Sequence, residues 1–117
     1  MTNPIKNQIK GVFIPVSNIE ISRDWYCKLL GLPPDGEIFF GHIYVLSMQG
    51  DTNIILDSKI FSPDNVFKIP VAQLSTDNIE ESFEYIKSMN IELVTGIENG
   101  HWFNIKDPDG NVIMICK

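Results

Sequence analysis

The sequence repeats itself at a spacing of about 60 residues, and this duplication limits the fold more than any single motif does. Asn18-Ile19-Glu20-Ile21-Ser22 returns as Asn78-Ile79-Glu80-Glu81-Ser82, an offset of 60 positions. Gly41-His42-Ile43-Tyr44 returns as Gly100-His101-Trp102-Phe103 at an offset of 59, and Gly50-Asp51 returns as Gly110-Asn111 at 60. Three matches at nearly one offset predict two copies of a single supersecondary unit.

Each half contains the same order of predicted elements, which is a strand, a helix and three strands. In the first half, β-branched runs and glycine turns predict strands near 11–16, 37–40, 42–48 and 52–57, with a helix from Ser17 or Asn18 to Gly31. Ser17 and Glu20 have the spacing of a capping box for that helix. The second half predicts strands near 71–75, 91–95, 101–105 and 111–116 and a helix over 77–89. This order predicts an α+β fold of two tandem βαβββ modules with helices on one sheet face.

The 117 residues are enough for one domain, with module 1 at about 9–57, a linker at 58–68 and module 2 at about 69–117. No apolar run approaches the length of a membrane span, and the first residues lack the apolar core of a signal peptide. Cys27 and Cys116 lack metal-type spacing, so we expect a reducing, cytoplasmic setting. With 15 acidic and 9 basic residues and no basic cluster, we expect neither nucleic acid nor a membrane as partner.

Two motifs carry a family resemblance that covers nearly the whole chain. Residues 16–26 read V-S-N-I-E-I-S-R-D-W-Y and are followed by Leu30-Gly31, and residues 107–113 read D-P-D-G-N-V-I. In this order the motifs resemble the glyoxalase/bleomycin-resistance (vicinal oxygen chelate) superfamily. The resemblance implies that each βαβββ module curls its sheet around a cleft with helices outside. It also implies a homodimer with a shared cleft, but no single function, since members include metal lyases, dioxygenases, transferases and metal-free drug binders.

Family enzymes hold a divalent cation with four side chains, usually His, Gln or Glu, and the resemblance allows these positions to be located here. They fall on Gly11, Val71, Met114 and either Ile54 or Ile55. None of these side chains offers the oxygen or imidazole donor that hard cations prefer, so the sequence predicts neither the family's metal site nor any other cofactor. His42 and His101 with Asp57 form a rival metal constellation, and their other reading is as duplicated residues at strand starts.

Strand alternation assigns Phe13, Val71, Gln73 and Met114 to the cleft side of the sheets. Apolar and aromatic residues with a few polar fixing points are typical of a small-molecule site. The predicted ligand-binding residues are Phe13, Tyr44, Val71, Gln73, His101, Trp102, Phe103 and Met114. The sequence thus favours a metal-free binding protein for a small hydrophobic or aromatic molecule. A lyase, dioxygenase or transferase with displaced metal ligands, a cofactor-free enzyme with His42, His101 or Glu98 as base, and a degenerate dimerisation module stay open.

Overall fold

The computed structural model describes residues 2–117 and divides the chain into two compact units. Unit 1 ends at Lys59, and unit 2 runs from Ile60 to Lys117. Within residues 2–117, no helix has both the length and the apolar character needed to cross a lipid bilayer. Because the boundary falls at Lys59/Ile60, each unit contains one complete copy of the sequence repeat.

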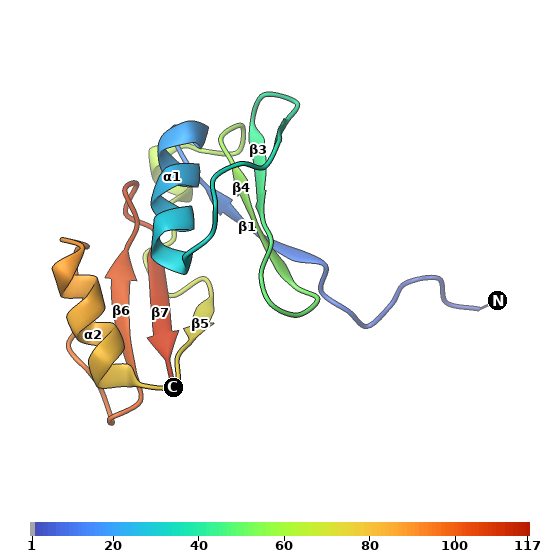
Figure 1. Cartoon of the computed structure of the whole chain (residues 1–117). Coiled ribbons are helices and arrows are strands. Elements are labelled where there is room, and N and C mark those ends of the chain that lie inside the picture. The colour runs from blue at the N-terminus through green and yellow to red at the C-terminus, as the bar shows by residue number, and fades with distance from the viewer. Residues whose placement is uncertain (1) are drawn as a thin grey trace. The chain divides into compact units, whose positions relative to one another are not determined.

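Unit 1 forms a four-stranded sheet with one helix (Figure 1). Its elements are β1 (Gly11–Pro15), α1 (Ile19–Leu30), β2 (Ile38–Phe39), β3 (Ile43–Leu46) and β4 (Asn53–Asp57). The strand order is β1-β4-β3-β2, with β1 parallel to β4 and the other neighbours antiparallel. β1 is therefore an edge strand, and its last residue, Pro15, sits where the missing N–H costs least.

Unit 2 repeats this plan with a three-stranded sheet in the order β5-β7-β6. Its elements are a short 3₁₀ turn (Pro63–Asn65), β5 (Gln73–Ser75), α2 (Ile79–Ser88), β6 (Trp102–Lys106) and β7 (Val112–Cys116). β5 is parallel to β7, and β6 is antiparallel to it. Helices, parallel pairs and antiparallel pairs thus combine in both units, and the α+β fold predicted by the duplication is confirmed.

The predicted strand at 91–95 is wrong as a regular strand. This segment runs beside β6 through an isolated bridge from Leu93 to Ile105. The backbone N–H of Val94 donates to the Asn104 carbonyl at 2.8 Å, but the N–H of Asn104 donates to the Thr95 hydroxyl rather than to a backbone carbonyl. Because a side chain replaces a ladder hydrogen bond, the pairing stops after a few residues.

Both helices are capped by an asparagine, which selects Asn18 from the two predicted starts of the first helix, and the capping box predicted from Ser17 is wrong. The Asn18 side chain accepts a hydrogen bond from the N–H of Ile21, and the Asn78 side chain accepts one from the N–H of Glu81, each at 3.0 Å. Asparagine caps a helix as well as serine does, because its short side chain reaches a free N–H in the first turn. The capping role therefore belongs to the residue that the repeat preserves.

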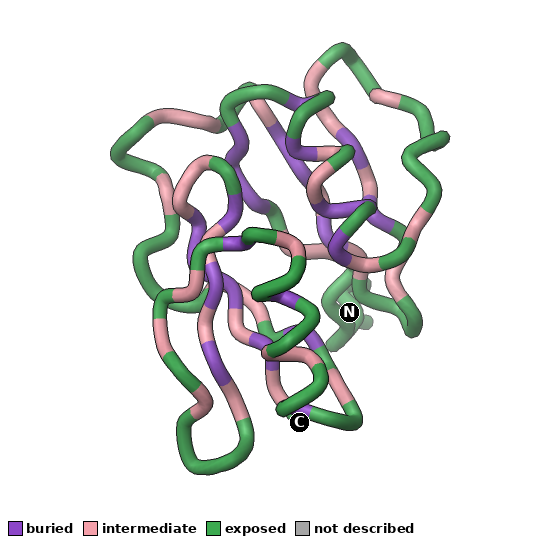
Figure 2. Tube along the Cα trace, turned by 60° about the vertical axis from the view of Figure 1, so that its left-hand side comes forward, coloured by how far each residue is buried: buried purple, intermediate pink, exposed green. Residues whose placement is uncertain are grey.

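Each sheet buries one face against its own helix. In unit 1 the buried residues of the strands include Ile14, Tyr44, Leu46, Ile54 and Leu56. In unit 2 they include Leu74, Phe103, Ile105, Ile113 and Ile115. Figure 2 shows the same alternation along the strands and one buried side on each helix. We call the opposite side of each sheet the helix-free face. It carries Phe13, Val45 and Ile55 in unit 1, and Gln73, Trp102, Asn104, Met114 and Cys116 in unit 2.

The Asp107-Pro108-Asp109-Gly110 turn joins β6 to β7 and is built around a buried carboxylate. Asp107 accepts hydrogen bonds from the backbone N–H of Asp109 and of Asn111, at 2.9 and 2.8 Å, and from the Asn111 side chain at 2.8 Å. Asn111 is fully buried, and its side-chain Oδ1 accepts from the backbone N–H of Phe67 at 3.0 Å. The two aspartates of this motif are thus turn formers, and Asn111 ties the segment before β5 to β7.

Candidate functional site

The eight predicted ligand-binding residues are divided between the two units. Phe13 and Tyr44 belong to unit 1, and Val71, Gln73, His101, Trp102, Phe103 and Met114 belong to unit 2. Within each unit, strand register decides which of them share a face. The residues predicted to bind a ligand therefore form one candidate surface in each unit.

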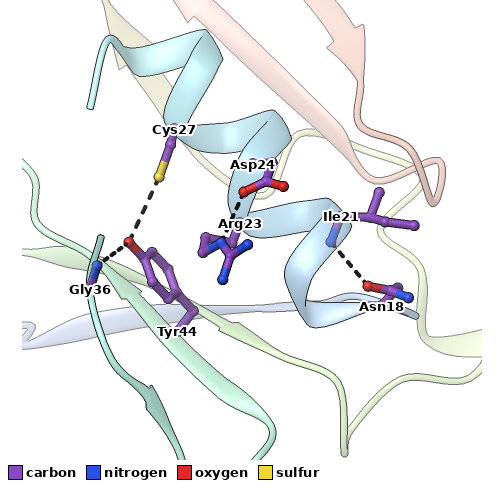
Figure 3. Close-up of polar contacts among 7 residues, drawn as sticks. All are labelled: Asn18, Ile21, Arg23, Asp24, Cys27, Gly36 and Tyr44. Carbon is purple, nitrogen blue, oxygen red and sulfur yellow. Dashed lines mark hydrogen bonds and ion pairs between the residues drawn. The ribbon is translucent and has the colours of Figure 1, made fainter. Parts of the chain in front are cut away.

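Tyr44 and Phe103 occupy equivalent positions, since 44 + 59 = 103, and both face the helix of their unit. Tyr44 is 3% exposed, and its Oη accepts hydrogen bonds from the N–H of Gly36 at 3.1 Å and from the Cys27 thiol at 3.9 Å (Figure 3). Phe103 has no exposed surface and packs edge-to-face against Phe83 of α2, with the ring centroids 5.1 Å apart. These two aromatic side chains are core residues on the opposite side of the sheet from the predicted ligand surface.

The burial of Tyr44 also changes its ionisation. Removal of the phenol from water raises the pKa of Tyr44, and the neighbouring Cys27 thiol acts in the same direction, while the hydrogen bond from Gly36 opposes them. Tyr44 therefore stays protonated to more alkaline pH than an exposed tyrosine. A proton held this firmly in the core is unsuited to acid–base work at neutral pH.

Three adjacent strands place Gln73, Met114 and Asn104 in one row across the helix-free face of unit 2. Gln73 pairs with Met114, and Met114 pairs with Asn104. The Gln73 amide donates to the Met114 sulfur at 3.3 Å, which draws the two side chains together. The predicted pair of a polar fixing point and a flexible thioether is thus brought side by side.

The next row of the same face holds Trp102 and Cys116, which pair directly, with Ser75 beyond Cys116. The Trp102 indole N–H donates to the Glu98 carboxylate at 3.1 Å, so its polar edge is satisfied by its own hairpin. His101, just before β6, is exposed, and its Nδ1 donates to the Asn99 carbonyl at 2.7 Å. Val71 lies just before β5 and donates its N–H to the Val112 carbonyl. Trp102 shares the face with Met114 and Gln73, whereas His101 lies at its margin.

Asn104 is the residue of this face that the sequence reasoning missed. It is partly buried between Trp102 and Lys106 along β6, and its Oδ1 is a buried side-chain oxygen with no hydrogen-bond partner within residues 2–117. A buried amide oxygen without a donor is costly, so such atoms usually find a water or a ligand. The sequence signal was its place in the alternation Trp102-Phe103-Asn104-Ile105, where every second residue is apolar and buried.

Phe13 lies on the helix-free face of unit 1 and is 49% exposed. It pairs with Ile55, which in turn pairs with Val45 on the next strand. This row is entirely apolar, in contrast to the Gln73–Met114–Asn104 row of unit 2. The helix-free face of unit 1 therefore offers hydrophobic contact, whereas that of unit 2 offers hydrogen-bonding groups as well.

Strand register also decides which isoleucine occupies the fourth metal-ligand position of the family. Met114 pairs with Gln73, and in unit 1 Phe13, the equivalent of Gln73 at an offset of 60, pairs with Ile55. Ile55 is thus the counterpart of Met114. A side chain on Gly11 would meet the Ile55 side chain at 2.7 Å, so hydrocarbon already fills the space beside Gly11.

The residues at these four positions do not fit a hard divalent cation. Gly11, Ile55 and Val71 have no donor atom, and the Met114 thioether is a soft ligand. Among the described residues, no group of three or more His, Cys, Asp or Glu is arranged to hold a metal ion. Of the rival set, His42 and Asp57 are in contact within unit 1, and His101 belongs to unit 2.

His42 and Asp57 make that contact at one end of the unit 1 sheet. The His42 Nδ1 lies 2.7 Å from Asp57 Oδ1, which also accepts the N–H of Lys59 at 2.9 Å. Asp57 is only 5% exposed, while the His42 side chain keeps about a quarter of its surface in solvent. The contact leaves Nε2 as the available nitrogen of the imidazole, since no described residue bonds it.

A surface cavity of about 380 Å³ lies in unit 2 at the start of α2. It is lined by Thr76, Asp77, Asn78, Glu81, Ser82 and Tyr85. None of these residues was predicted to bind a ligand. Most of their polar groups form the cap of α2, as in the bond from Ser82 to Thr76 at 2.6 Å.

The duplicated plan, with a helix on one face of each sheet and side chains available on the other, defines a class of two-module α+β proteins. Within that class, the model of the Glyoxalase/Bleomycin resistance protein/Dioxygenase superfamily matches residues 8–115. The chain belongs to this superfamily, as the two sequence motifs indicate. It matches none of the curated proteins with which it was compared.

Solved structures with the same fold include proteins of different functions. The antibiotic-binding protein TnmS3 from Streptomyces sp. CB03234 is 21% identical, with a TM-score of 0.75 and 98% of each chain covered. A possible glyoxalase from Bacillus cereus is 13% identical, with a TM-score of 0.74 over 96% of this chain and all of that one. Glyoxalase I from Leishmania major is 14% identical, with a TM-score of 0.71 over 96% of this chain and 87% of that one. At these identities the likeness establishes the fold alone.

Proposed function

We propose that this protein is a metal-free binding protein for a small hydrophobic or aromatic molecule. The observation that carries the proposal is the character of the four positions at which enzymes of the family hold their cation. Gly11 and Ile55 lie against each other as hydrocarbon, and Val71 and Met114 likewise offer nothing to a hard ion. Metal-assisted chemistry would need donors that these positions lack.

The helix-free face of unit 2 supports binding of a planar ligand. Trp102 and Met114 provide polarisable surface, and the Gln73 and Asn104 amides provide hydrogen-bonding groups in the same row. A planar ligand that removes about 300 Å² of apolar surface from water gains roughly 7 kcal/mol before association costs are subtracted. Micromolar binding therefore also needs the hydrogen bonds, and the unpartnered Asn104 Oδ1 calls for a ligand that carries a donor.

We also propose that the protein acts as a homodimer in the cytoplasm. Phe13 and Phe39 are both more than 40% exposed, and exposed aromatic residues are typical of surfaces that become covered. Both cysteines are free thiols, which suits a reducing compartment. Analytical ultracentrifugation at micromolar concentration measures the subunit number, and a monomer there would remove this part of the proposal.

The binding function is tested by melting-temperature shifts over a panel of planar aromatic compounds, with and without a hydroxyl or amine. We expect stabilisation by some compounds that carry a donor, and loss of that stabilisation in Trp102→Ala and Asn104→Leu. Ile21→Ala, a change of an exposed residue on α1, serves as the control and should leave the shifts unchanged. Metal analysis of the purified protein is the complementary measurement, and a stoichiometric divalent ion would overturn the proposal.

A further inference from the structure

The two copies of the repeat use different residues at the same hairpin turn. In unit 1 the turn between β2 and β3 consists of Phe40 and Gly41, with backbone φ values of 54° and 79°. In unit 2 the equivalent turn consists of Asn99 and Gly100, with φ values of 50° and 66°. Both turns are closed by a backbone hydrogen bond, from His42 to Phe39 at 3.0 Å and from His101 to Glu98 at 2.9 Å.

Asn-Gly is the sequence that a two-residue turn of this shape favours, because both positions require positive φ. Phenylalanine resists positive φ, since its Cβ crowds the backbone there. Phe40 gains no burial in return, because 87% of its surface is exposed. The chain itself thus contains the more stable solution, Asn99, and yet presents an aromatic ring at the unit 1 turn.

The second difference between the copies lies beside the first. Asp57 holds the His42 imidazole, whereas the equivalent position in unit 2, at an offset of 59, is Cys116. The Phe40 and His42 rings lie 6.4 Å apart between centroids with a tilt of 38°. A flat ring stacked between two others needs about 7 Å, so a small rotation of the exposed Phe40 side chain opens this space.

The orientation of the His42 imidazole limits which hydrogen-bonding group a ligand can present to it. Nδ1 faces the buried Asp57 carboxylate, and Nε2 is left for a ligand. A neutral imidazole accepts a hydrogen bond at Nε2, and an imidazolium donates one there. A phenolic oxygen suits both cases, as a hydroxyl donor or as a phenolate acceptor.

We propose that the Phe40–His42 end of unit 1 is a second binding site, which takes a hydroxylated aromatic ring between these two side chains. Phe40 stacks on the ligand, His42 Nε2 meets its hydroxyl oxygen, and Asp57 is the positioning residue that holds the imidazole. The site lies wholly within unit 1 and does not depend on the ligand surface proposed for unit 2.

The experiment is an NMR titration of the full-length protein with 4-nitrophenol and, in parallel, with nitrobenzene, which lacks the hydroxyl. We expect 4-nitrophenol to shift the backbone amides of residues 39–42 and 57–59 and to bind more tightly than nitrobenzene. Phe40→Asn should weaken both compounds, by about tenfold for 4-nitrophenol, as expected for the loss of an aromatic stack. His42→Gln should remove the preference for 4-nitrophenol while leaving nitrobenzene binding within about twofold.

Asp57→Ala should reduce the same preference without weakening nitrobenzene, a result that loss of local packing would not produce. Ile21→Ala, which also removes exposed apolar surface from unit 1, is the matched control and should leave both affinities unchanged. Shifts confined to residues 73–75, 102–104 and 114–116 would overturn this second site and leave the proposed function intact. Equal binding of the two compounds by the unaltered protein would overturn the role of His42.

Discussion

Units 1 and 2 build one plan from two sequences, and their differences separate what the plan requires from what each copy adds. Both helices are capped by an asparagine at the same repeat position, and both sheets pair the first strand in parallel with the last. The copies differ in the aromatic core residue, which is Tyr44 in unit 1 and Phe103 in unit 2, and in the two-residue turn before β3 or β6. They also differ at the position held by Asp57 in unit 1 and by Cys116 in unit 2. Capping and strand order are therefore properties of the plan, while Phe40 at the hairpin turn and the carboxylate that holds the His42 imidazole are found in unit 1 and not at the equivalent positions of unit 2.

The largest expected effect concerns the aromatic core residue. Phe103→Ala should lower the free energy of unfolding by about 4 kcal/mol, because it leaves a cavity against Phe83 of α2. Chemical denaturation measures the change, and Phe103→Leu, which fills more of the space, should lose less. Should Phe103→Ala leave stability unchanged while weakening a ligand, Phe103 would be a binding residue and not the core residue of unit 2.

The next prediction separates the turns that precede the last strand of each unit. Asn111→Ala should cost about 3 kcal/mol, because it leaves the buried Asp107 carboxylate and the Phe67 N–H with fewer partners. By strand register the equivalent residue in unit 1 is Thr52, one position after the Asp51 that the sequence repeat pairs with Asn111. Thr52 is exposed and donates to the Ile9 carbonyl at 3.0 Å. Thr52→Ala should therefore cost less than about 1 kcal/mol in the same denaturation experiment, and equal costs would refute the assigned difference between the two turns.

The third prediction concerns Tyr44, whose equivalent in unit 2, Phe103, has no hydroxyl. Tyr44→Phe should cost about 1 kcal/mol at neutral pH, because the Gly36 N–H loses its acceptor. Burial raises the pKa of Tyr44, so above the unfolded-state tyrosine pKa of about 10 the unfolded chain loses its proton first. Stability should accordingly fall as pH rises above about 10, and Tyr44→Phe should flatten that fall. Unfolding free energies measured from pH 8 to 11 would contradict the assignment if both proteins declined in parallel.

The smallest expected effect is a gain in stability. Phe40→Asn should raise the free energy of unfolding by about 1 kcal/mol, because asparagine tolerates positive φ better than phenylalanine. The reciprocal change, Asn99→Phe, should lower it by a similar amount. Thermal denaturation of both variants tests this symmetry, and a loss of stability in Phe40→Asn would mean that the Phe40 ring is held by contacts that favour its strained backbone.

Some features of the fold were predictable because they depend on local sequence. Period-two alternation identified the buried faces of the strands, and the buried residues of α1 recur at the spacing of an amphipathic helix, as Ile19, Ser22, Tyr26 and Leu29 show. The duplication gave the order of elements in unit 2 from that in unit 1. The absence of a regular strand at 91–95 was not predictable, because it arises where the hydroxyl of Thr95 takes the place of a backbone acceptor.

The candidate site was predictable only in part. Alternation correctly grouped Gln73 with Met114, but it could not place Tyr44 and Phe103, which were chosen for their aromatic character and lie on the buried side of their strands. Asn104 was missed because the lack of a partner for its Oδ1 depends on which groups surround that atom in space and not on residue type. The His42–Asp57 contact joins residues 15 positions apart through the β3–β4 register, and no spacing rule gives its distance.

The amino-acid sequence by itself determined the two-module plan, the superfamily, and side chains at the cation positions that suit no hard metal ion, because each depends on residue identity at a fixed place in a repeat. Tertiary structure decided which isoleucine side chain lies beside Gly11 and which aromatic residues are buried. It also decided that His42 contacts a carboxylate while His101 contacts a backbone carbonyl. These outcomes depend on strand pairing and on distances between residues far apart in the chain, and side-chain contact is settled only when the strands are in register.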